Sequence, residues 1–287
     1  MAGATETLRT LLKGNELVCF PTCFDALSAR LTRDAGFPMS FMSGFAVAAT
    51  RLGMPDTGLI TFSEMLDQLR AICNAVPGFP IVGDGDTGYG NAMNVRRTVA
   101  EYARAGAACV MIEDQLAPKK CGHFDGKQVV SREEARLKVR AAVEVAREAD
   151  ILVLARTDAR GVDGFEAAIE RCRDFEEEGA DIVFLEAPRS EEELRAFAQA
   201  MRQPTMANLA PGIKTPMIPR ATLHDMGIRL VSYHPLLFSA TRAMQDALQA
   251  LLADDDAAAP PVVSFDEIKE IVGLPEYNDM EQRYATS

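Results

Sequence analysis

Short apolar stretches rich in β-branched residues alternate along the chain with longer stretches in which apolar residues recur at helical spacing. Short apolar runs bounded by turn residues are typical of buried parallel strands, and the segments between them are long enough to form crossover helices. Eight strands are predicted, at Leu17–Pro21, Met39–Ser43, Pro80–Asp84, Ala108–Glu113, Ile151–Thr157, Asp181–Glu186, Pro204–Asn208 and Arg229–Ser232.

A glycine recurs where a helical segment ends and the next apolar run begins, at Gly36, Gly106, Gly179 and Gly227. Glycine readily adopts the left-handed conformation that terminates helices, so these positions set the boundaries between helix and strand. The predicted helices include Ala26–Ala35, Thr61–Asn74, Asn94–Ala105, Arg132–Ala149, Gly164–Glu178 and Ser190–Met201.

Eight strands that alternate with helices predict a (β/α)8 barrel, the TIM-barrel fold of the α/β class. A doubly wound open sheet is the alternative, and the number of strands favours the barrel. Polar residues follow directly after several of the apolar runs. In a barrel these positions share the face that carries the active site, so we expect the functional residues there.

The barrel and its active site are expected to occupy residues 1–252, followed by a linker at 253–263 and a C-terminal helical tail at 264–287. The linker is acidic at first, then rich in alanine, and it ends in two prolines. Ser264 and Glu267 have the spacing of a capping box, which predicts that a helix begins there. Such a tail could pack on its own barrel or on that of a neighbouring subunit.

Composition and charge narrow the function classes. The 287 residues carry a formal net charge of −12, and 48% of them are hydrophobic, as in folded globular proteins. An acidic surface argues against nucleic acid and anionic membranes as partners. No apolar run approaches the roughly 18 residues of a membrane helix, and the 6 dispersed cysteines are typical of reduced thiols. We therefore expect a cytoplasmic protein that acts on small molecules.

The densest polar motif contains Asp84 and Asp86, directly after the third predicted strand. Carboxylates two positions apart on an extended segment point the same way, and their mutual repulsion is relieved by a shared cation or proton. Asp56 and Glu113 follow other strands and could complete an acidic site. Hard oxygen ligands favour Mg²⁺, with Mn²⁺ as the substitute. The alternative is a polar turn in which the aspartates accept backbone N–H groups.

A basic loop, Lys119-Lys120-Cys121-Gly122-His123, lies between the fourth strand and its helix. Two lysines and a histidine beside a cysteine predict a lowered thiol pKa, and such a thiol can act as an acid or base. Glycines in and after this loop would let it move as a lid over the active site. The alternative is a solvated basic loop with an incidental cysteine.

Arg156 ends an apolar strand, where an unpaired charge would be costly. A guanidinium at that position suits bidentate binding of a substrate carboxylate. The alternative is an ion pair with a carboxylate of the barrel such as Glu186, and both can hold at once. His224 and His234 lack the spacing of metal ligands, so we expect them to be structural.

Six motifs occur in order over nearly the whole chain: S-G-F, D-G-D-T-G-Y-G, E-D-Q, P-K-K-C-G-H, A-R-T-D-A-R and A-N-L-A-P-G-I-K-T-P. Together they resemble the isocitrate lyase / phosphoenolpyruvate mutase superfamily. The K-K-C-G-H element resembles its carbon–carbon lyase branch. The length and the tail E-Y-N-D-M-E-Q-R-Y resemble the group of the 2,3-dimethylmalate lyases and the petal death protein. The resemblance implies a barrel whose last helix is swapped between subunits, in a homotetramer.

The resemblance also implies roles for individual residues. Asp84 would coordinate Mg²⁺, or Mn²⁺ in its place, and Asp56, Asp86 and Glu113 would hold its waters. Catalysis would rest on Cys121 as the proton donor or acceptor, together with Glu113, Arg156 and His123. The implied substrate contacts are Ser43, Gly44, Phe45 and Arg156 at the α-oxo acid end, Gly122 in the gating loop, and Glu186 and Asn208 at the far end. Phe45 departs from the family's S-G-G element.

The implied activity is Mg²⁺-dependent retro-aldol cleavage of a 2-hydroxy di- or tricarboxylate, such as a substituted malate, to a 2-oxo acid such as pyruvate and a carboxylate. Alternatives are 2-methylisocitrate lyase and oxaloacetate acetylhydrolase, and the intact set of acidic and thiol groups disfavours a non-catalytic barrel. The lyases usually carry a Glu two residues after the Asn of the seventh strand, where this chain has Ala210. This departure predicts a preference for an apolar group at C3 over a third carboxylate, for which Lys214 would be the nearby cation.

Overall fold

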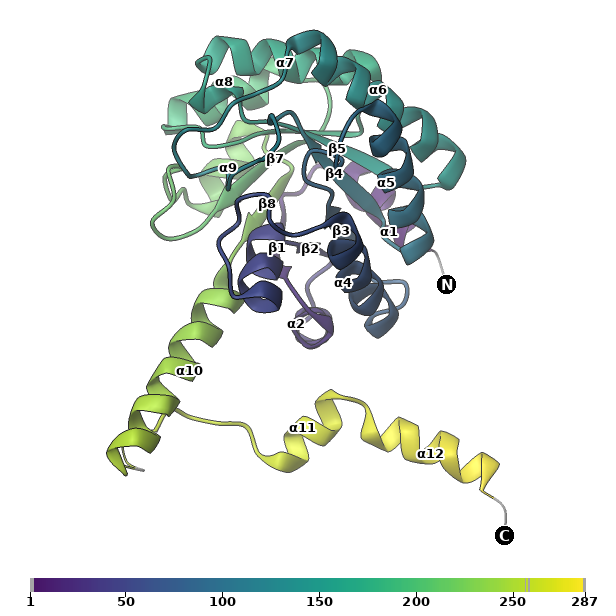
Figure 1. Cartoon of the computed structure of the whole chain (residues 1–287), viewed down its shortest axis with the longest axis vertical. Helices are drawn as coiled ribbons and strands as arrows, with labels where there is room; N and C mark the ends of the chain where they lie inside the picture. The colour runs from purple at the N-terminus through teal and green to yellow at the C-terminus, as the bar shows by residue number, and fades with distance from the viewer. Residues whose placement is uncertain (1–2, 256, 258, 286–287) are drawn as a thin grey trace. The chain divides into compact units, whose positions relative to one another are not determined.

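Eight parallel strands close into a barrel in chain order in the computed structural model, which describes residues 3–255, 257 and 259–285 (Figure 1). The ring closes where β1 pairs with β8. The strands are β1 (Val18–Cys23), β2 (Ser40–Met42), β3 (Ile81–Asp84), β4 (Cys109–Glu113), β5 (Leu152–Thr157), β6 (Ile182–Leu185), β7 (Thr205–Leu209) and β8 (Leu230–Tyr233). Each overlaps a predicted strand, so the (β/α)8 barrel is confirmed over the doubly wound sheet.

Helices surround the barrel (Figure 1). They are α1 (Ala4–Lys13), α2 (Ala26–Asp34), α3 (Gly44–Val47), the π-helical turn η1 (Ala48–Leu52), α4 (Phe62–Ala75), α5 (Ala92–Ala105), α6 (Arg132–Ala149), the 3₁₀ turn η2 (Ala159–Gly161), α7 (Phe165–Glu178), α8 (Glu191–Ala200) and α9 (Arg220–Met226). Local capping residues fix these bounds: Thr61 and Glu64 form a capping box at the start of α4, and the left-handed backbone of Gly106 and Gly179, at a φ of 98°, ends α5 and α7.

The core lies inside the barrel and is built from alternate strand positions. Phe20, Met111 and Phe184 belong to one buried apolar cluster to which all eight strands contribute. Helix α1, which precedes the first strand, adds Leu8 to the same cluster. The core therefore fills the barrel interior and leaves the carboxyl ends of the strands for polar side chains.

The chain divides into two compact units, Met1–Pro235 and Leu236–Ser287. Helix α10 (Pro235–Ala253), which was not predicted, begins at the boundary, and the second unit continues through α11 (Phe265–Ile271) and α12 (Leu274–Tyr284). The predicted capping box of Ser264 with Glu267 is present. Residues 256 and 258 of the expected linker lie outside the described residues. Among the described helices, none is long and apolar enough to cross a membrane.

Candidate active site

One polar side chain from the carboxyl end of each strand faces the barrel axis beyond the apolar core. Side chains alternate along a strand, so the residue two positions after an inward-facing core residue also points inward. The ring consists of Thr22, Ser43, Asp84, Glu113, Arg156, Glu186, Asn208 and Ser232. The sequence analysis identified six of them and missed Thr22 and Ser232, although the same alternation would have found both.

Arg156 is the cationic centre of this ring. Its Nε lies 2.8 Å from Asp158 Oδ2 and 3.3 Å from Glu113 Oε2, and its Nη1 lies 3.1 Å from Glu186 Oε2. The alternative of an ion pair with Glu186 is therefore realised. Burial disfavours the charge, but Asp158, Glu186 and Glu113 together raise the pKa of Arg156 well above its usual value. The guanidinium is thus held charged and in a fixed plane.

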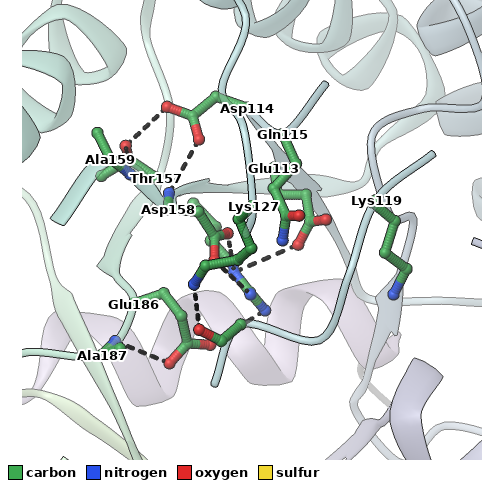
Figure 2. Close-up of polar contacts among 12 residues, drawn as sticks. Glu113, Asp114, Gln115, Lys119, Lys127, Thr157, Asp158, Ala159, Glu186 and Ala187 are labelled. Carbon is green, nitrogen blue, oxygen red and sulfur yellow. Dashed lines mark hydrogen bonds and ion pairs between the residues drawn. The ribbon is translucent and has the colours of Figure 1, made fainter. Parts of the chain in front are cut away.

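Asp158, which received no role from the sequence, joins Arg156 to the loop before α6. Its carboxylate accepts two hydrogen bonds from Arg156, at 2.8 and 3.1 Å, and a third from Lys127 Nζ at 2.8 Å. The same ammonium donates to the carbonyl of Gly122. Burial opposes ionisation, yet Arg156 and Lys127 lower the pKa of Asp158 to about 2. Lys127 therefore ties the Cys121 loop to Asp158, and Figure 2 shows Lys127 beside Asp158.

Behind this pair, Asp114 connects the ends of β4 and β5. Its Oδ2 accepts from Thr157 Oγ1 at 2.6 Å and from Arg171 Nη1 at 3.1 Å, while Oδ1 accepts from the Asp158 backbone N–H at 2.9 Å. Burial raises the pKa of Asp114 to about 6, although each of these donors favours the carboxylate. Asp114 fixes the backbone from which Arg156 and Asp158 project.

The predicted acidic cluster is assembled at the end of β3. Asp84 accepts backbone N–H groups from Gly44 at 2.9 Å and from Asp86 at 3.0 Å, so the alternative of a hydrogen-bonded turn holds for this residue. Lys119 Nζ lies 2.5 Å from Asp56 Oδ1 and 2.6 Å from Asp86 Oδ1. Burial, reinforced by Asp86, raises the pKa of Asp84 to about 6. Lys119 points into the acidic cluster.

The residues of this cluster fit a hard divalent cation by chemistry and by charge. Glu113 Oε1 is buried and makes no hydrogen bond to any described residue, and Asp56 Oδ1 and Asp86 Oδ1 are buried with the Lys119 ammonium as an ion-pair partner that a divalent cation could replace. The buried carboxylates of the barrel mouth are Asp56, Asp84, Asp86, Glu113, Asp158 and Glu186, and the cations are Lys119, Lys127 and Arg156. Six anions against three cations leave three formal negative charges. As they stand, the described His, Cys, Asp and Glu side chains form no group of three arranged around a metal position.

The Cys121 loop lies against the acidic cluster. The backbone N–H of Cys121 donates to the carbonyl of Asp56 at 2.9 Å, and both ends of the Gln115 amide hold the backbone of Lys120. The expected lowering of the thiol pKa is wrong, because burial raises the pKa of Cys121 to about 11. The physical reason is that Lys119 pairs with carboxylates and Lys120 reaches the carbonyl of Asp125 instead of the thiol. Cys121 is therefore a protonated thiol.

Gly122 and His123 bring the same loop against Arg156 and Glu186. A Cβ at position 122 would collide with the Arg156 guanidinium and lie 2.8 Å from Glu186 Cδ. This glycine is therefore required for close approach, a reason other than the mobility inferred from the sequence. His123 Nε2 lies 3.3 Å from Glu186 Oε1, and burial lowers the pKa of the imidazole.

On the side of the ring opposite Asp84, Asn208 contacts two groups of the β8 segment. Ser232 Oγ donates to Asn208 Oδ1 at 2.9 Å, and His234 Nε2 lies 2.6 Å from the same oxygen. The other imidazole nitrogen of His234 lies 3.3 Å from Thr22 Oγ1 on β1. His234, which the sequence analysis set aside as structural, thus lies at the carboxyl end of the barrel and links three strands.

The family model described as phosphoenolpyruvate phosphomutase matches residues 8–252. The chain belongs to this family. Relatives of this chain include 2,3-dimethylmalate lyase from Eubacterium barkeri, which is 40% identical over 97% of both chains. A 2-methylisocitrate lyase from Aeropyrum pernix is 40% identical over 97% of this chain and 89% of its own, and a chloroplastic carboxyvinyl-carboxyphosphonate phosphorylmutase from Arabidopsis thaliana is 39% identical over 96% and 83%.

Solved structures agree with the family assignment. Oxaloacetate acetylhydrolase in complex with the inhibitor 3,3-difluorooxalacetate matches with a TM-score of 0.94 at 34% identity, over 99% of this chain and 98% of its own. Phosphonopyruvate hydrolase in complex with oxalate and Mg²⁺ matches with a TM-score of 0.86 at 28% identity, over 99% of both chains. These findings confirm the resemblance stated from the motifs and the expectation of a carbon–carbon lyase.

Proposed function

We propose that this family member cleaves the C2–C3 bond of a substituted malate, of the 2,3-dimethylmalate kind, to a 2-oxo acid such as pyruvate and a carboxylate. The observation that carries the proposal is the position of a protonated thiol, Cys121, on a loop that lies between an acidic cluster at Asp56 and a buried arginine at Arg156. A carbanion-forming lyase needs these three features: a cation site, an anion anchor and an acid.

The cation site would consist of Asp84, with Asp56, Asp86 and Glu113 around it. Their carboxylate oxygens and the surplus of buried negative charge favour Mg²⁺, with Mn²⁺ as the substitute. When bound, the ion would act as a Lewis acid that stabilises negative charge developing on the substrate's C2 oxygen. Lys119 forms ion pairs with Asp56 and Asp86, so at least one of these ion pairs would have to break when the ion binds.

Arg156 would bind the carboxylate of the 2-oxo acid product, with Ser43, Gly44 and Phe45 lining the same end. Asp158 occupies one edge of the guanidinium through Nε and Nη2, and Nη1 contacts Glu186 at 3.1 Å, so a ligand carboxylate would share Nη1 with Glu186. Two fixed hydrogen bonds hold the guanidinium plane before substrate arrives, which avoids an ordering cost on binding.

Cys121 would protonate the carbon that leaves. Bond cleavage places the C2–C3 electron pair on C3, which then bears a strongly basic aci-carboxylate and takes up one proton, while the C2 hydroxyl loses one. A thiol with a pKa of about 11 is protonated at neutral pH and can give its proton to such a base. Gly122 and His123 place the loop directly against Arg156 and Glu186, which excludes water from the reactive fragment.

The far end of the site supports a small substrate over a tricarboxylate. Ala210 is buried and brings no charge to the end of β7. Lys214, the cation that a third carboxylate would need, is paired with Asp125 at 2.5 Å. An apolar pocket discriminates between substituents that differ by one methylene by only about 10–200-fold, so several alkylmalates are expected to react.

The test is a product screen with purified enzyme and saturating Mg²⁺, in which kcat/KM is measured for 2,3-dimethylmalate, 2-methylisocitrate and oxaloacetate. We expect pyruvate from dimethylmalate with the highest kcat/KM, and a clear preference for methylisocitrate or release of oxalate from oxaloacetate would refute the assignment. Asp84→Ala should abolish turnover and, in calorimetry, Mn²⁺ binding. The matched control is Asp67→Ala on the exposed surface of α4, which should change neither.

We also propose that the enzyme is a cytoplasmic homotetramer in which residues 264–287 form a tail packed on a second copy of the chain. The tail exposes large apolar side chains, among them Phe265 and Tyr284 with 79% and 85% of their surface accessible. Phe265→Asp should lower the mass measured by light scattering, whereas an unchanged tetramer mass in that variant would contradict packing of the tail on a second copy.

A further inference from the structure

We propose that His234 is a positioning residue that fixes the side-chain amide of Asn208 so that its N–H groups face the substrate end remote from the acidic cluster. The inference rests on the proposed function for the identity of the substrate, a dicarboxylate, but its geometry is independent of that function. It gives a role to a histidine whose sequence context indicated none.

Two donors converge on one oxygen of Asn208. His234 Nε2 lies 2.6 Å and Ser232 Oγ 2.9 Å from Asn208 Oδ1. Both contacts lie on the β8 side of the amide, so the oxygen faces β8 and the Nδ2 group points away from it. No described residue accepts a hydrogen bond from this NH₂ group.

The protonation state of His234 follows from its second contact. To donate from Nε2, a neutral imidazole must accept at Nδ1, and the hydroxyl of Thr22 lies there at 3.3 Å. Burial supports the neutral form, because it lowers the pKa of His234 to about 4 even though Glu186 opposes this effect and His123 adds to it. With this tautomer the Thr22 hydroxyl donates to Nδ1, and Nε2 donates to Asn208 Oδ1.

The position of Asn208 in the barrel indicates what its amide would bind. β3 and β7 lie four strands apart in a closed ring of eight, so Asp84 and Asn208 lie on opposite sides of the barrel mouth. A dicarboxylate held at β3 by its 2-hydroxy acid end would extend its second carboxylate toward β7. An amide N–H is a suitable neutral donor for that group, and it avoids adding a further charge beside Glu186.

A double-mutant cycle with a conservative rescue tests this role. His234→Leu removes the donor, and His234→Gln places an amide N–H near the former Nε2. We expect kcat/KM for 2,3-dimethylmalate to fall about ten-fold in His234→Leu and to recover in His234→Gln, as for loss of one well-placed hydrogen bond. In an Asn208→Ala background, His234→Leu should have no further effect. Additive losses, or no rescue by glutamine with unchanged thermal stability, would overturn the inference.

Binding measurements separate this inference from the proposed reaction. In calorimetry with Mg²⁺, His234→Leu should leave the affinity for oxalate, which spans only the 2-oxo acid end, unchanged. It should weaken methylsuccinate, an unreactive longer dicarboxylate, by about ten-fold. If no malate is cleaved but this difference appears, the proposed substrate fails and the role of His234 stands. Equal losses for both probes, or no loss of methylsuccinate binding in Asn208→Ala, would refute the role of His234.

Discussion

Replacement of Asp114 by asparagine should destabilise the barrel strongly, although the two side chains have nearly the same volume. Asp114 is 2% exposed, and its Oδ2 accepts hydrogen bonds from Thr157 Oγ1 and Arg171 Nη1. An asparagine can keep one acceptor oxygen for the Asp158 N–H, but its NH₂ group then faces the guanidinium. Loss of a charge-assisted hydrogen bond costs about 1.5–3 kcal/mol, and a buried charge left without its partner raises the total to about 3–5 kcal/mol.

The assay is equilibrium unfolding in urea followed by circular dichroism, with thermal unfolding as the check. At roughly 2–4 °C per kcal/mol, Asp114→Asn should lower Tm on the order of 10 °C. Arg171→Met removes the opposite charge, so the double variant should be less destabilised than the sum of the single variants by more than 1 kcal/mol. A loss below 1 kcal/mol in Asp114→Asn, or additivity within about 0.5 kcal/mol, would refute the reasoning.

Three further predictions concern the site. Cys121→Ser should fold normally and lose turnover by about 100-fold or more, together with deuterium incorporation into the carboxylate product; wild-type rates would show that the thiol is no acid. Lys127→Met should raise KM and speed proteolysis of the Cys121 loop, because Asp158 and this loop lose the ammonium that donates to both. Lys120→Met is the control and should change neither KM nor the rate of proteolysis. His234 has a lowered pKa, so its stabilising contribution is complete above pH 6.5 and is lost as pH falls toward 4. Wild-type unfolding free energy should therefore drop about 1–2 kcal/mol more than that of His234→Gln between pH 7.5 and 5, and equal drops would contradict the shift.

Strands and most helices could be predicted because each is bounded by a local signal. α6 was predicted at its observed bounds, Arg132–Ala149, since its apolar positions repeat at helical spacing and Ser131 caps its first turn. α10 was missed, because its run of exposed apolar residues lacks the alternation of buried and polar faces from which a barrel helix is recognised.

Those residues of the candidate site that lie at the carboxyl ends of strands could be predicted from the sequence. Alternation places Asp84, Glu113 and Arg156 in the barrel mouth, and the same alternation extends to Thr22 and Ser232, which were overlooked because hydroxyl side chains resemble ordinary strand residues. Contacts that depend on long side chains could not be predicted. A lysine reaches several ångströms from its own backbone, so neighbours in sequence do not determine its partner.

The Cys121 loop illustrates this limit and its chemical consequence. In the sequence, Lys119 and Lys120 stand beside the thiol and suggest an activated thiolate, but the folded chain directs Lys119 into the acidic cluster. The lysine thus neutralises carboxylates that would otherwise repel one another, and the thiol is left buried among groups that do not stabilise its anion. A thiolate would be the wrong species for the proposed reaction, whose last step requires a proton. The placement of Lys119 therefore favours the acid, since a lysine that moved toward Cys121 would stabilise the thiolate.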